Sequence, residues 1–333
     1  MGGAAACRPF AVPLNLRSCN RRSMTKITSP DGTPLSRLCF GAMQFGGKAD
    51  DDDSLAMYEA CRDAGLNFFD TAHVYTDGAS ETMLGRFAAT ERDRLVIATK
   101  VSFPGGSGRA SILSSVEESR GRLGLDVIDV LYLHRWDAET PLEETFETLA
   151  GLQRDGTVRH LAVSNFAAWQ VMKAQGVAAT FDTRIDMIQP MYNLVKRQAE
   201  VEILPMARDQ GIAVVPYSPL GGGLLTGKYR DGTEGRLTSD ARYAKRYGLD
   251  WMHRCAADLA VLAEEAGTAP ATLAVAWVLR NPDIAAPIVS ARNAEQLAPS
   301  LAALSFDLDD ALHARITALS QTPPPATDRL EEA

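Results

Sequence analysis

The stretch GLNFFDTAHVY, residues 65–75, contains a short apolar run that is followed by polar residues, and similar apolar runs recur along the chain. Residues 66–69 predict a short buried strand, because they form a brief apolar run directly after a glycine. Asp70 closes the strand, and a carboxylate there needs a partner because an isolated buried charge is too costly. Tyr75 follows in the next loop, close enough to share a site with Asp70. The same residues would also be found if Asp70 only capped the strand and Tyr75 only packed in the core. The residues at the ends of the later strands distinguish this structural role from a shared functional site.

Apolar runs of the same kind recur along the chain and alternate with helical segments. Seven of them begin about 27 to 32 residues apart, the length of one strand, one helix and two short loops. The runs are residues 38–40, 66–69, 95–99, 127–133, 158–163, 185–188, 212–216 and 285–289. Eight such units predict an α/β fold of the closed (β/α)8 type, a TIM barrel, rather than an open doubly wound sheet.

The predicted barrel units occupy residues 24–320 as a single domain. A turn between two short extended segments predicts an N-terminal β-hairpin over residues 27–35. Two helical patterns after the last strand predict extra C-terminal helices at residues 294–304 and 309–319. The polar connection 230–250 shows no apolar run, so we expect an irregular loop there, and a loop of that length is commonly functional.

The two ends of the chain differ in composition from the predicted domain. Residues 1–23 carry four arginines and no acid, and they predict either a disordered leader or a segment upstream of a start at Met24. Residues 321–333 include three consecutive prolines and predict a loose tail.

The composition limits the partners that we expect. The 333-residue chain has a net charge of −8 and no block of Lys and Arg, so we expect neither nucleic acid nor, without a membrane-length apolar run, a membrane. The five cysteines are scattered without a C-x-x-C pair, which favours a reducing compartment, the cytoplasm. The histidines show no metal-binding spacing, so we expect no metal. The oligomeric state stays open.

Four polar residues follow the carboxyl ends of three neighbouring predicted strands. Asp70 and Tyr75 follow the second strand, Lys100 follows the third and His134 the fourth. Because (β/α)8 barrels place their catalytic residues at this end, we expect the four to share one site. Taken one at a time, Lys100 could be a solvated strand end and His134 a core histidine.

Together the four residue types suit the protonation of a carbonyl oxygen while a hydride reaches its carbon. Tyrosine, with a pKa of about 10, is a poor acid at neutral pH. A lysine cation about 4 Å away is worth roughly 4 kcal/mol at an effective dielectric of about 20. We therefore expect Lys100 to lower the pKa of Tyr75 by up to about three units. Asp70 would hold Lys100 charged, and a neutral His134 would orient the carbonyl and share the proton transfer.

A barrel aldolase is an alternative function for the same residues. It would use Lys100 as a Schiff-base nucleophile, which requires a neutral lysine. Asp70 as a neighbour favours a charged lysine instead, so we prefer carbonyl reduction.

Three stretches resemble the Asp/Tyr/Lys/His tetrad motifs of the aldo-keto reductase superfamily: GLNFFDTAHVY at residues 65–75, ATK at 98–100 and LYLH at 131–134. The likeness extends from about residue 24 to residue 319. It implies a (β/α)8 barrel that binds NADPH, or less often NADH, and reduces an aldehyde or ketone to an alcohol. Asp70, Tyr75, Lys100 and His134 would be its catalytic residues, with Tyr75 as the proton donor.

The resemblance also implies residues that hold the nicotinamide and the pyrophosphate. Ser164, Asn165 and Gln189 match residues that bind the nicotinamide amide, and Tyr217 matches the residue that stacks on its ring. The stretch YSPLGGGLLTGKY at residues 217–229 matches the loop that meets the pyrophosphate. The residues of this loop that should contact the cofactor are Ser218, Pro219, Leu220, Gly222 and Lys228. Gly41, at the end of the first strand, should also belong to the cofactor site.

The adenosine end of the cofactor site is implied after the eighth strand. Ser290, Arg292 and Gln296 match that region, and an arginine suits a 2′-phosphate, so NADPH is favoured over NADH. Two residues depart from the family pattern: Ser290 stands where glycine is common, and Ser300 where an adenine-binding asparagine is usual.

The substrate pocket should include Met43, Arg135 and Trp136, although these side chains could also serve packing alone. No sequence motif identifies which small-molecule carbonyl compound is the substrate. The long loop after the seventh strand resembles bacterial and potassium-channel-β-like branches of the superfamily. That likeness implies a further alternative, an NADPH-binding redox sensor or regulatory subunit with little turnover.

Overall fold

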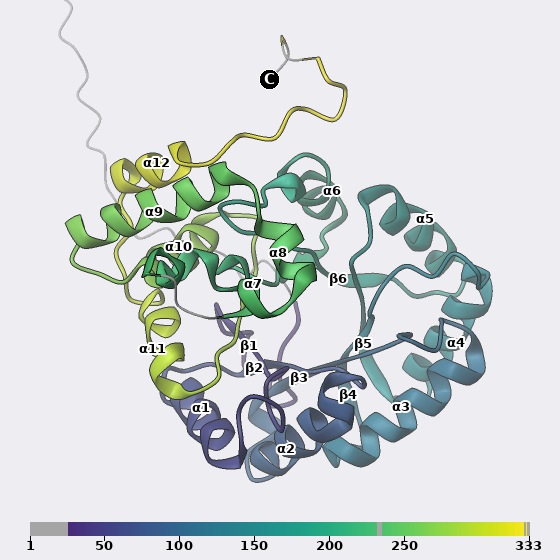
Figure 1. The fold of residues 1–333 in the computed structure, drawn as a ribbon. Helices are drawn as coiled ribbons and strands as arrows, with labels where there is room; N and C mark the ends of the chain where they lie inside the picture. The colour runs from purple at the N-terminus through teal and green to yellow at the C-terminus, as the bar shows by residue number, and fades with distance from the viewer. Residues whose placement is uncertain (1–25, 232–234, 330, 332–333) are drawn as a thin grey trace, which may run out of the picture.

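The computed structural model describes residues 26–231, 235–329 and 331 (Figure 1). The predicted leader, residues 1–23, lies outside the described residues. After α12 (Asp310–Ala318) the chain extends away from the helices in Figure 1, and most of its described side chains are exposed.

All eight predicted strands form, and they lie parallel to their neighbours in the order β7-β6-β5-β4-β3-β2-β1-β8. The strands are β1 (Cys39–Gly41), β2 (Phe68–Asp70), β3 (Val96–Val101), β4 (Ile128–Leu133), β5 (Val158–Ser164), β6 (Ile185–Gln189), β7 (Ala213–Val214) and β8 (Ile288–Val289). Each lies within or beside an apolar run that predicted it.

Single bridges close the sheet between β7 and β8. The backbone N–H of Ala285 donates to the Val214 carbonyl at 2.9 Å, and that of Ile288 donates to the Pro216 carbonyl at 2.8 Å. Parallel bridges join Val214 to Ile284 and Tyr217 to Ile288. The predicted (β/α)8 barrel is therefore confirmed.

Alternation along the strands decides which side chains face the barrel interior. Phe68 of β2 belongs to the interior cluster, with Val96 and Ala98 of β3, whereas Phe69 packs outward against the helices. Since successive side chains of a strand point to opposite faces, Asp70 and Lys100 continue the inward-facing rows. The strand period thus directs a carboxylate and an amine into the same end of the barrel.

Helices surround the barrel, and Figure 1 shows α1 to α5 along one side of the strands and α9 to α12 on the other. The α-helices are α1 (Asp51–Asp63), α2 (Ala79–Ala88), α3 (Arg109–Leu123), α4 (Leu142–Arg154), α5 (Ala168–Ala179), α6 (Ile203–Gln210), α7 (Arg236–Ser239), α8 (Ala241–Tyr247), α9 (Asp250–Glu265), α10 (Pro270–Arg280), α11 (Ala294–Ala302) and α12 (Asp310–Ala318). Short 3₁₀ helices are η1 (Tyr75–Gly78), η2 (Arg92–Arg94), η3 (Gln198–Glu200), η4 (Gly221–Thr226) and η5 (Lys228–Asp231). The two predicted C-terminal helices correspond to α11 and α12.

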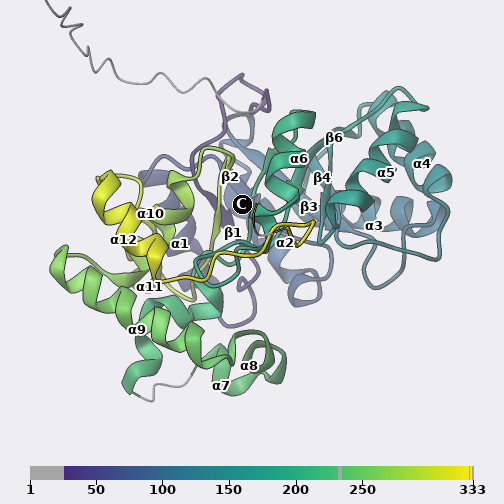
Figure 2. The ribbon, with the colours of Figure 1, turned by 90° about the horizontal axis from the view of Figure 1, so that it is seen from above.

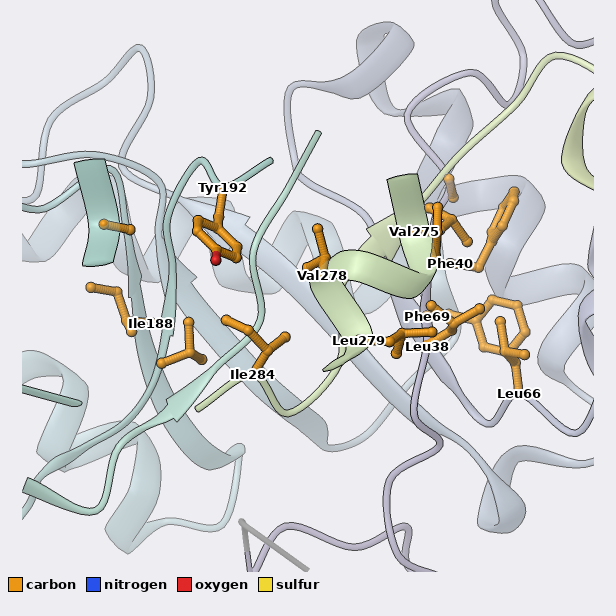
Figure 3. Packing of buried hydrophobic residues seen from close by; sticks show 14 of the residues in the cluster. Leu38, Phe40, Leu66, Phe69, Ile188, Tyr192, Val275, Val278, Leu279 and Ile284 are labelled. Atoms are coloured by element: carbon orange, nitrogen blue, oxygen red, sulfur yellow. The ribbon is translucent and has the colours of Figure 1, made fainter. Parts of the chain in front are cut away.

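The main hydrophobic core lies between the barrel and its helices. Figure 3 shows Val275, Val278 and Leu279 of α10 among buried residues of the barrel wall such as Phe69 and Ile188. This packing fixes the strands against the helices and leaves the strand ends to carry the polar site.

The prediction of an irregular loop at residues 230–250 is wrong, because the described part of this segment forms α7 and α8. Asp240 caps α8 by accepting a hydrogen bond from the Arg242 backbone N–H at 2.9 Å. Leu237 and Tyr247 are buried against the core. In Figures 1 and 2 the two helices lie together at one end of the barrel, where they follow β7 and pack on η4.

The N-terminal hairpin is present as a single antiparallel bridge between Thr28 and Pro34. In the described chain, no single helix is long and apolar enough to span a membrane; α9 and α10 meet those criteria only together, and they are bent by 98° at their junction. Cys39, Cys61 and Cys255 are buried free thiols.

Candidate active site

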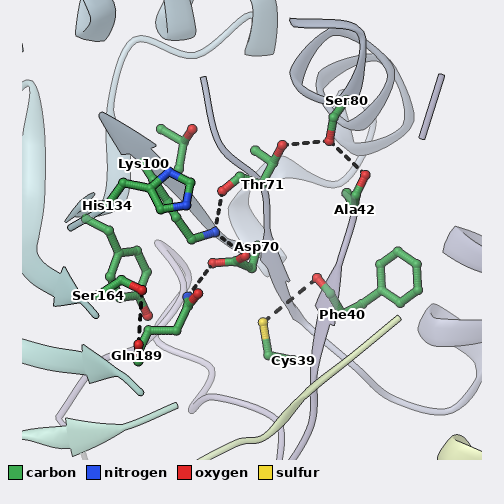
Figure 4. Close-up of polar contacts among 12 residues, drawn as sticks. Cys39, Phe40, Ala42, Asp70, Thr71, Ser80, Lys100, His134, Ser164 and Gln189 are labelled. Carbon is green, nitrogen blue, oxygen red and sulfur yellow. Dashed lines mark hydrogen bonds and ion pairs between the residues drawn. The ribbon is translucent and has the colours of Figure 1, made fainter. Parts of the chain in front are cut away.

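A buried ion pair lies at the centre of the candidate site. Lys100 and Asp70 are only 1% and 3% exposed, and the Lys100 ammonium donates to Asp70 Oδ1 (Figure 4). The same ammonium donates to the Thr71 carbonyl at 2.7 Å, and Gln189 Nε2 donates to the other Asp70 oxygen at 2.8 Å. Both carboxylate oxygens are therefore satisfied. Burial raises the pKa of Asp70, and the Lys100 charge and the hydrogen bonds from Lys100 and Gln189 oppose that shift and favour the carboxylate.

Tyr75 and His134 lie directly beside this ion pair. The Lys100 amino nitrogen is 4.9 Å from the centre of the Tyr75 ring, and the Tyr75 and His134 ring centres are 5.8 Å apart with their planes at 82°. The four residues that the sequence predicted for one site thus share one site.

The protonation states follow from burial and from the Lys100 charge. Burial lowers the pKa of His134 to about 3, with help from the Lys100 and Arg135 charges, so the imidazole is neutral. Burial is the largest single influence on the pKa of Lys100 and lowers it, but Asp70 and Tyr75 together outweigh burial and raise that pKa above its ordinary value. A charged lysine is unsuited to Schiff-base formation, so this geometry does not favour the aldolase alternative.

The expectation of a lowered pKa for Tyr75 is wrong for the site as it stands. Burial raises the pKa of the phenol because it disfavours the phenolate, and the opposing pull of Lys100 offsets only part of this effect. Tyr75 is consequently a neutral phenol at physiological pH. It is able to donate a proton when negative charge develops on a nearby oxygen.

The loop that carries Tyr75 is held by residues that the sequence did not single out. Arg122 of α3 donates to the His73 carbonyl at 3.0 Å and to Glu81 Oε2 at 3.2 Å. Glu81 is fully buried and also accepts from the Thr99 hydroxyl at 2.6 Å. Because Thr99 neighbours Lys100, this network ties the Tyr75 loop to the strand that carries the lysine. No local motif identifies it, since its members are 18 to 49 residues apart.

Ser164, Asn165, Gln189 and Tyr217 form one hydrogen-bonded group beside the ion pair, as expected for residues of one subsite. The Ser164 hydroxyl donates to the Gln189 carbonyl at 3.0 Å (Figure 4). Asn165 donates to the His134 carbonyl at 2.9 Å and accepts from the Tyr217 hydroxyl at 2.8 Å. Gln189 also contacts Asp70, a role that the sequence did not indicate.

The loop after β7 turns through three successive glycines with positive φ, from Gly221 to Gly223. A Cβ on Gly222 would lie 2.7 Å from the Tyr243 ring, so only glycine fits there. The Lys228 amino nitrogen lies close to this turn, since a Cβ on Gly223 would be only 3.4 Å from it. Before the turn, Ser218 also has a positive φ of 60°, Pro219 is buried and Leu220 packs on the core.

The residues predicted for the adenosine end lie on the loop from β8 to α11. Arg292 is half-buried, and no acid pairs with it within the described chain. Ser290 and Gln296 are exposed, with the Gln296 N–H bound to the α11 cap Asn293 at 3.0 Å. Ser290 approaches Gly41, where a Cβ would lie 3.8 Å from the serine Cβ. Ser300 is buried, and its hydroxyl has no hydrogen-bond partner among the described residues.

The residues predicted for the substrate pocket lie on the loops after β1 and β4. Met43 and Trp136 are half-buried and Arg135 is exposed. The Arg135 guanidinium lies 4.3 Å from the centre of the Phe103 ring, and Trp136 packs against Phe166 with ring centres 5.3 Å apart. Phe103 was not identified from the sequence, because a single aromatic residue in a loop carries no recognisable motif.

A family model for the aldo/keto reductase family matches residues 37–321. The chain belongs to the aldo/keto reductase family. Among its relatives, the uncharacterized oxidoreductase YrpG of Bacillus subtilis is 36% identical over 301 residues, which cover 84% of this chain and 90% of that protein. The probable voltage-gated potassium channel subunit beta of Arabidopsis thaliana is 34% identical over 299 residues, covering 84% and 90% of the two chains.

A solved structure agrees with this aldo/keto reductase assignment. The glycerol dehydrogenase of Gluconobacter oxydans is similar with a TM-score of 0.74 and 31% identity, covering 86% of this chain and 92% of that chain. The family and its relatives support an oxidoreductase with the TIM-barrel fold.

Aldo/keto reductases bind a nicotinamide nucleotide, and the residues of this chain fit one. The glycine turn with Lys228 above it offers backbone and a cation to a pyrophosphate. Arg292, which has no acid partner in the described chain, directly precedes Asn293, the N-cap of α11. Within residues 26–231, 235–329 and 331, no group of three or more His, Cys, Asp or Glu could hold a metal ion.

Proposed function

We propose that the protein is an NADPH-dependent reductase that converts an aldehyde or a ketone to an alcohol. The proposal rests on the Lys100–Asp70 ion pair, whose ammonium lies 4.9 Å from the centre of the Tyr75 ring, with a neutral His134 beside that ring. When bound, the nicotinamide supplies the hydride. The solved relative is named for glycerol dehydrogenation, which converts an alcohol to a carbonyl compound, the reverse of carbonyl reduction.

The chain's own residues would act on the carbonyl oxygen. A ring N–H of neutral His134 orients that oxygen, and the Tyr75 phenol donates its proton to it. The Lys100 ammonium stabilises the negative charge that forms on the phenol oxygen, and Asp70 keeps the lysine protonated. Thr71 and Gln189 satisfy the remaining hydrogen bonds of the pair and so hold its geometry.

The remaining predicted residues are proposed to hold the nucleotide. Ser164, Asn165, Gln189 and Tyr217 would contact the nicotinamide, while Gly222 and Lys228 would contact the pyrophosphate. Arg292, which has no acid partner in the described chain, supports NADPH over NADH because a guanidinium binds a 2′-phosphate through two hydrogen bonds. The buried free thiols support a reducing compartment, and we propose the cytoplasm.

A second candidate is a regulatory subunit that binds NADPH but turns over little, suggested by the relative named as a channel subunit. The test is a screen for NADPH and NADH oxidation over aldehydes, sugars, glyceraldehyde derivatives, pyridoxal and aromatic ketones. A reductase oxidises NADPH with at least one of these carbonyls. Tight NADPH binding with negligible turnover on all of them would favour the regulatory subunit instead.

A further inference from the structure

The mouth of the barrel is aromatic on one side and polar on the other. On the β3–β5 side, three partly exposed aromatic residues follow successive strands, and we name them the aromatic wall: Phe103, Trp136 and Trp169. On the β5–β8 side lie Asn165, Tyr217 and Arg292, which the proposed function assigns to the nucleotide. The residues assigned to the nucleotide leave the aromatic wall available to the substrate.

The aromatic wall begins at the site itself. The Phe103 ring centre lies 5.8 Å from that of His134, and the Tyr75 ring centre lies at the same distance from His134. Phe103 is 38% exposed. A flat group attached to a carbonyl held between Tyr75 and His134 would thus meet an aromatic face within a few ångströms of the reacting carbon.

The outer part of the aromatic wall extends away from the reacting centre. Trp136 comes two residues after His134, and its ring centre lies 5.7 Å from that of Trp169, in the first turn of α5. Trp169 is 62% exposed, the largest exposed fraction among the large hydrophobic side chains described as exposed. An exposed tryptophan at the rim of a site is typical of ligand contact rather than of core packing.

Arg135 adds a positive charge to this side of the mouth. Its guanidinium lies 4.3 Å from the centre of the Phe103 ring, and no described acid forms an ion pair with it. The carboxylate of Asp137, two residues away, binds other groups instead of Arg135. It accepts hydrogen bonds from the backbone N–H groups of Ser107 and Glu139 and from the Thr140 hydroxyl. Arg135 is therefore available to an anionic group of a ligand.

We propose that the substrate is an aromatic aldehyde or ketone that carries a carboxylate on the side of the ring remote from the carbonyl. The ring lies against Phe103 and the tryptophans, and Arg135 binds the carboxylate. This inference rests on the proposed reductase function and adds to it the class of substrate and the residues that select it.

Three probes separate the contributions of the ring and the carboxylate: 4-formylbenzoate, 4-methylbenzaldehyde without the carboxylate, and 4-formylcyclohexanecarboxylate without the aromatic ring. Arg135→Gln should lower kcat/KM about tenfold for both carboxylates, since it removes a charge-assisted hydrogen bond, and change 4-methylbenzaldehyde less than about twofold. Trp169→Leu and Phe103→Leu should lower kcat/KM about threefold or more for the two aromatic probes only.

Arg94→Gln is the matched control, because Arg94 is 68% exposed and precedes β3 at the opposite end of the barrel. It should leave all three values unchanged. If Arg135→Gln alters the three probes alike, or the leucine variants spare the aromatic probes, the proposed substrate class is wrong while the reductase function stands. If the wild-type protein reduces no carbonyl in either this set or the wider screen, the reductase function fails, and the substrate class fails with it.

Discussion

On one side of the barrel mouth, β3 and β4 run for six residues each and carry Lys100 and, just past the strand end, His134. On the other side, β7 and β8 are two residues each, and the residues proposed for the pyrophosphate and the adenosine end lie on the glycine turn and the loop that follow them. The first side is held by a buried ion pair and paired strands, the second by single bridges and a packed pair of short helices. We call the first side the rigid half and the second the adaptable half, and we propose that the first carries the chemistry and the second holds the pyrophosphate and adenosine end of the cofactor. Substitutions in the first half should therefore lower kcat, whereas substitutions in the second half should raise the Kd of the nucleotide.

The largest effect is expected for Lys100→Met on the rigid half. The change leaves Asp70 buried without its cation, so the free energy of unfolding should fall by about 3 to 5 kcal/mol. kcat should fall by about 10³-fold, because the charge that stabilises the Tyr75 phenolate is lost. Denaturant unfolding and steady-state kinetics measure the two effects.

The double variant Asp70→Asn/Lys100→Met separates stability from chemistry. It should recover most of the lost unfolding free energy, since no uncompensated charge is left in the barrel, but it should stay inactive. Recovery of activity together with stability would mean that Lys100 serves the fold alone.

A smaller effect is expected for Arg122→Met, which removes a support of the Tyr75 loop. Glu81 would keep only the Thr99 hydroxyl, so unfolding should become easier by about 1 to 3 kcal/mol. kcat should fall about tenfold with the NADPH Kd unchanged, because a displaced Tyr75 slows chemistry but not binding. Arg122→Lys should restore part of kcat. A loss of stability with kcat intact would show that the network does not position Tyr75.

On the adaptable half, Arg292→Ala should leave kcat nearly unchanged and raise the NADPH Kd about tenfold, through the loss of a charge-assisted contact with the 2′-phosphate. The NADH Kd should change less than about twofold. Fluorescence titration with both nucleotides measures this. Equal weakening of the two would contradict the assignment of Arg292 to the phosphate.

The smallest effect is expected from pH. The pKa of His134 is lowered to about 3, so it stays neutral above that pH, whereas the raised pKa values of Tyr75 and Lys100 keep both protonated until well above neutrality. kcat/KM should therefore be flat around neutral pH and fall on the alkaline side, and it should also fall at acidic pH where Asp70, whose pKa is raised by burial, becomes protonated. An acidic limb near pH 6.5 would mean that His134 titrates in the free enzyme.

The same contrast explains how much could be predicted from the sequence. All eight strands were predicted because apolar runs follow the strand period, and Asp70, Tyr75, Lys100 and His134 came together because the carboxyl ends of neighbouring parallel strands meet. The helices α7 and α8 were missed, since a polar segment forms them through a cap at Asp240 and contacts of Tyr247 that depend on the fold.

Other features could not be predicted because they depend on long-range contacts. The Arg122 network joins residues up to 49 positions apart, and the aromatic wall is assembled from two loops and the first turn of α5. The raised pKa of Tyr75 depends on the depth of burial, which the charge of Lys100 alone did not reveal.

The most direct test of the central claim is Tyr75→Phe, measured in single turnover with NADPH and the best carbonyl of the screen. The ring and its packing are kept while the proton donor is removed. We predict that the rate of carbonyl reduction falls about 10³-fold and that the NADPH Kd stays within about twofold of the wild-type value. A variant that reduces the carbonyl at the wild-type rate would contradict the assignment of Tyr75 as the proton donor.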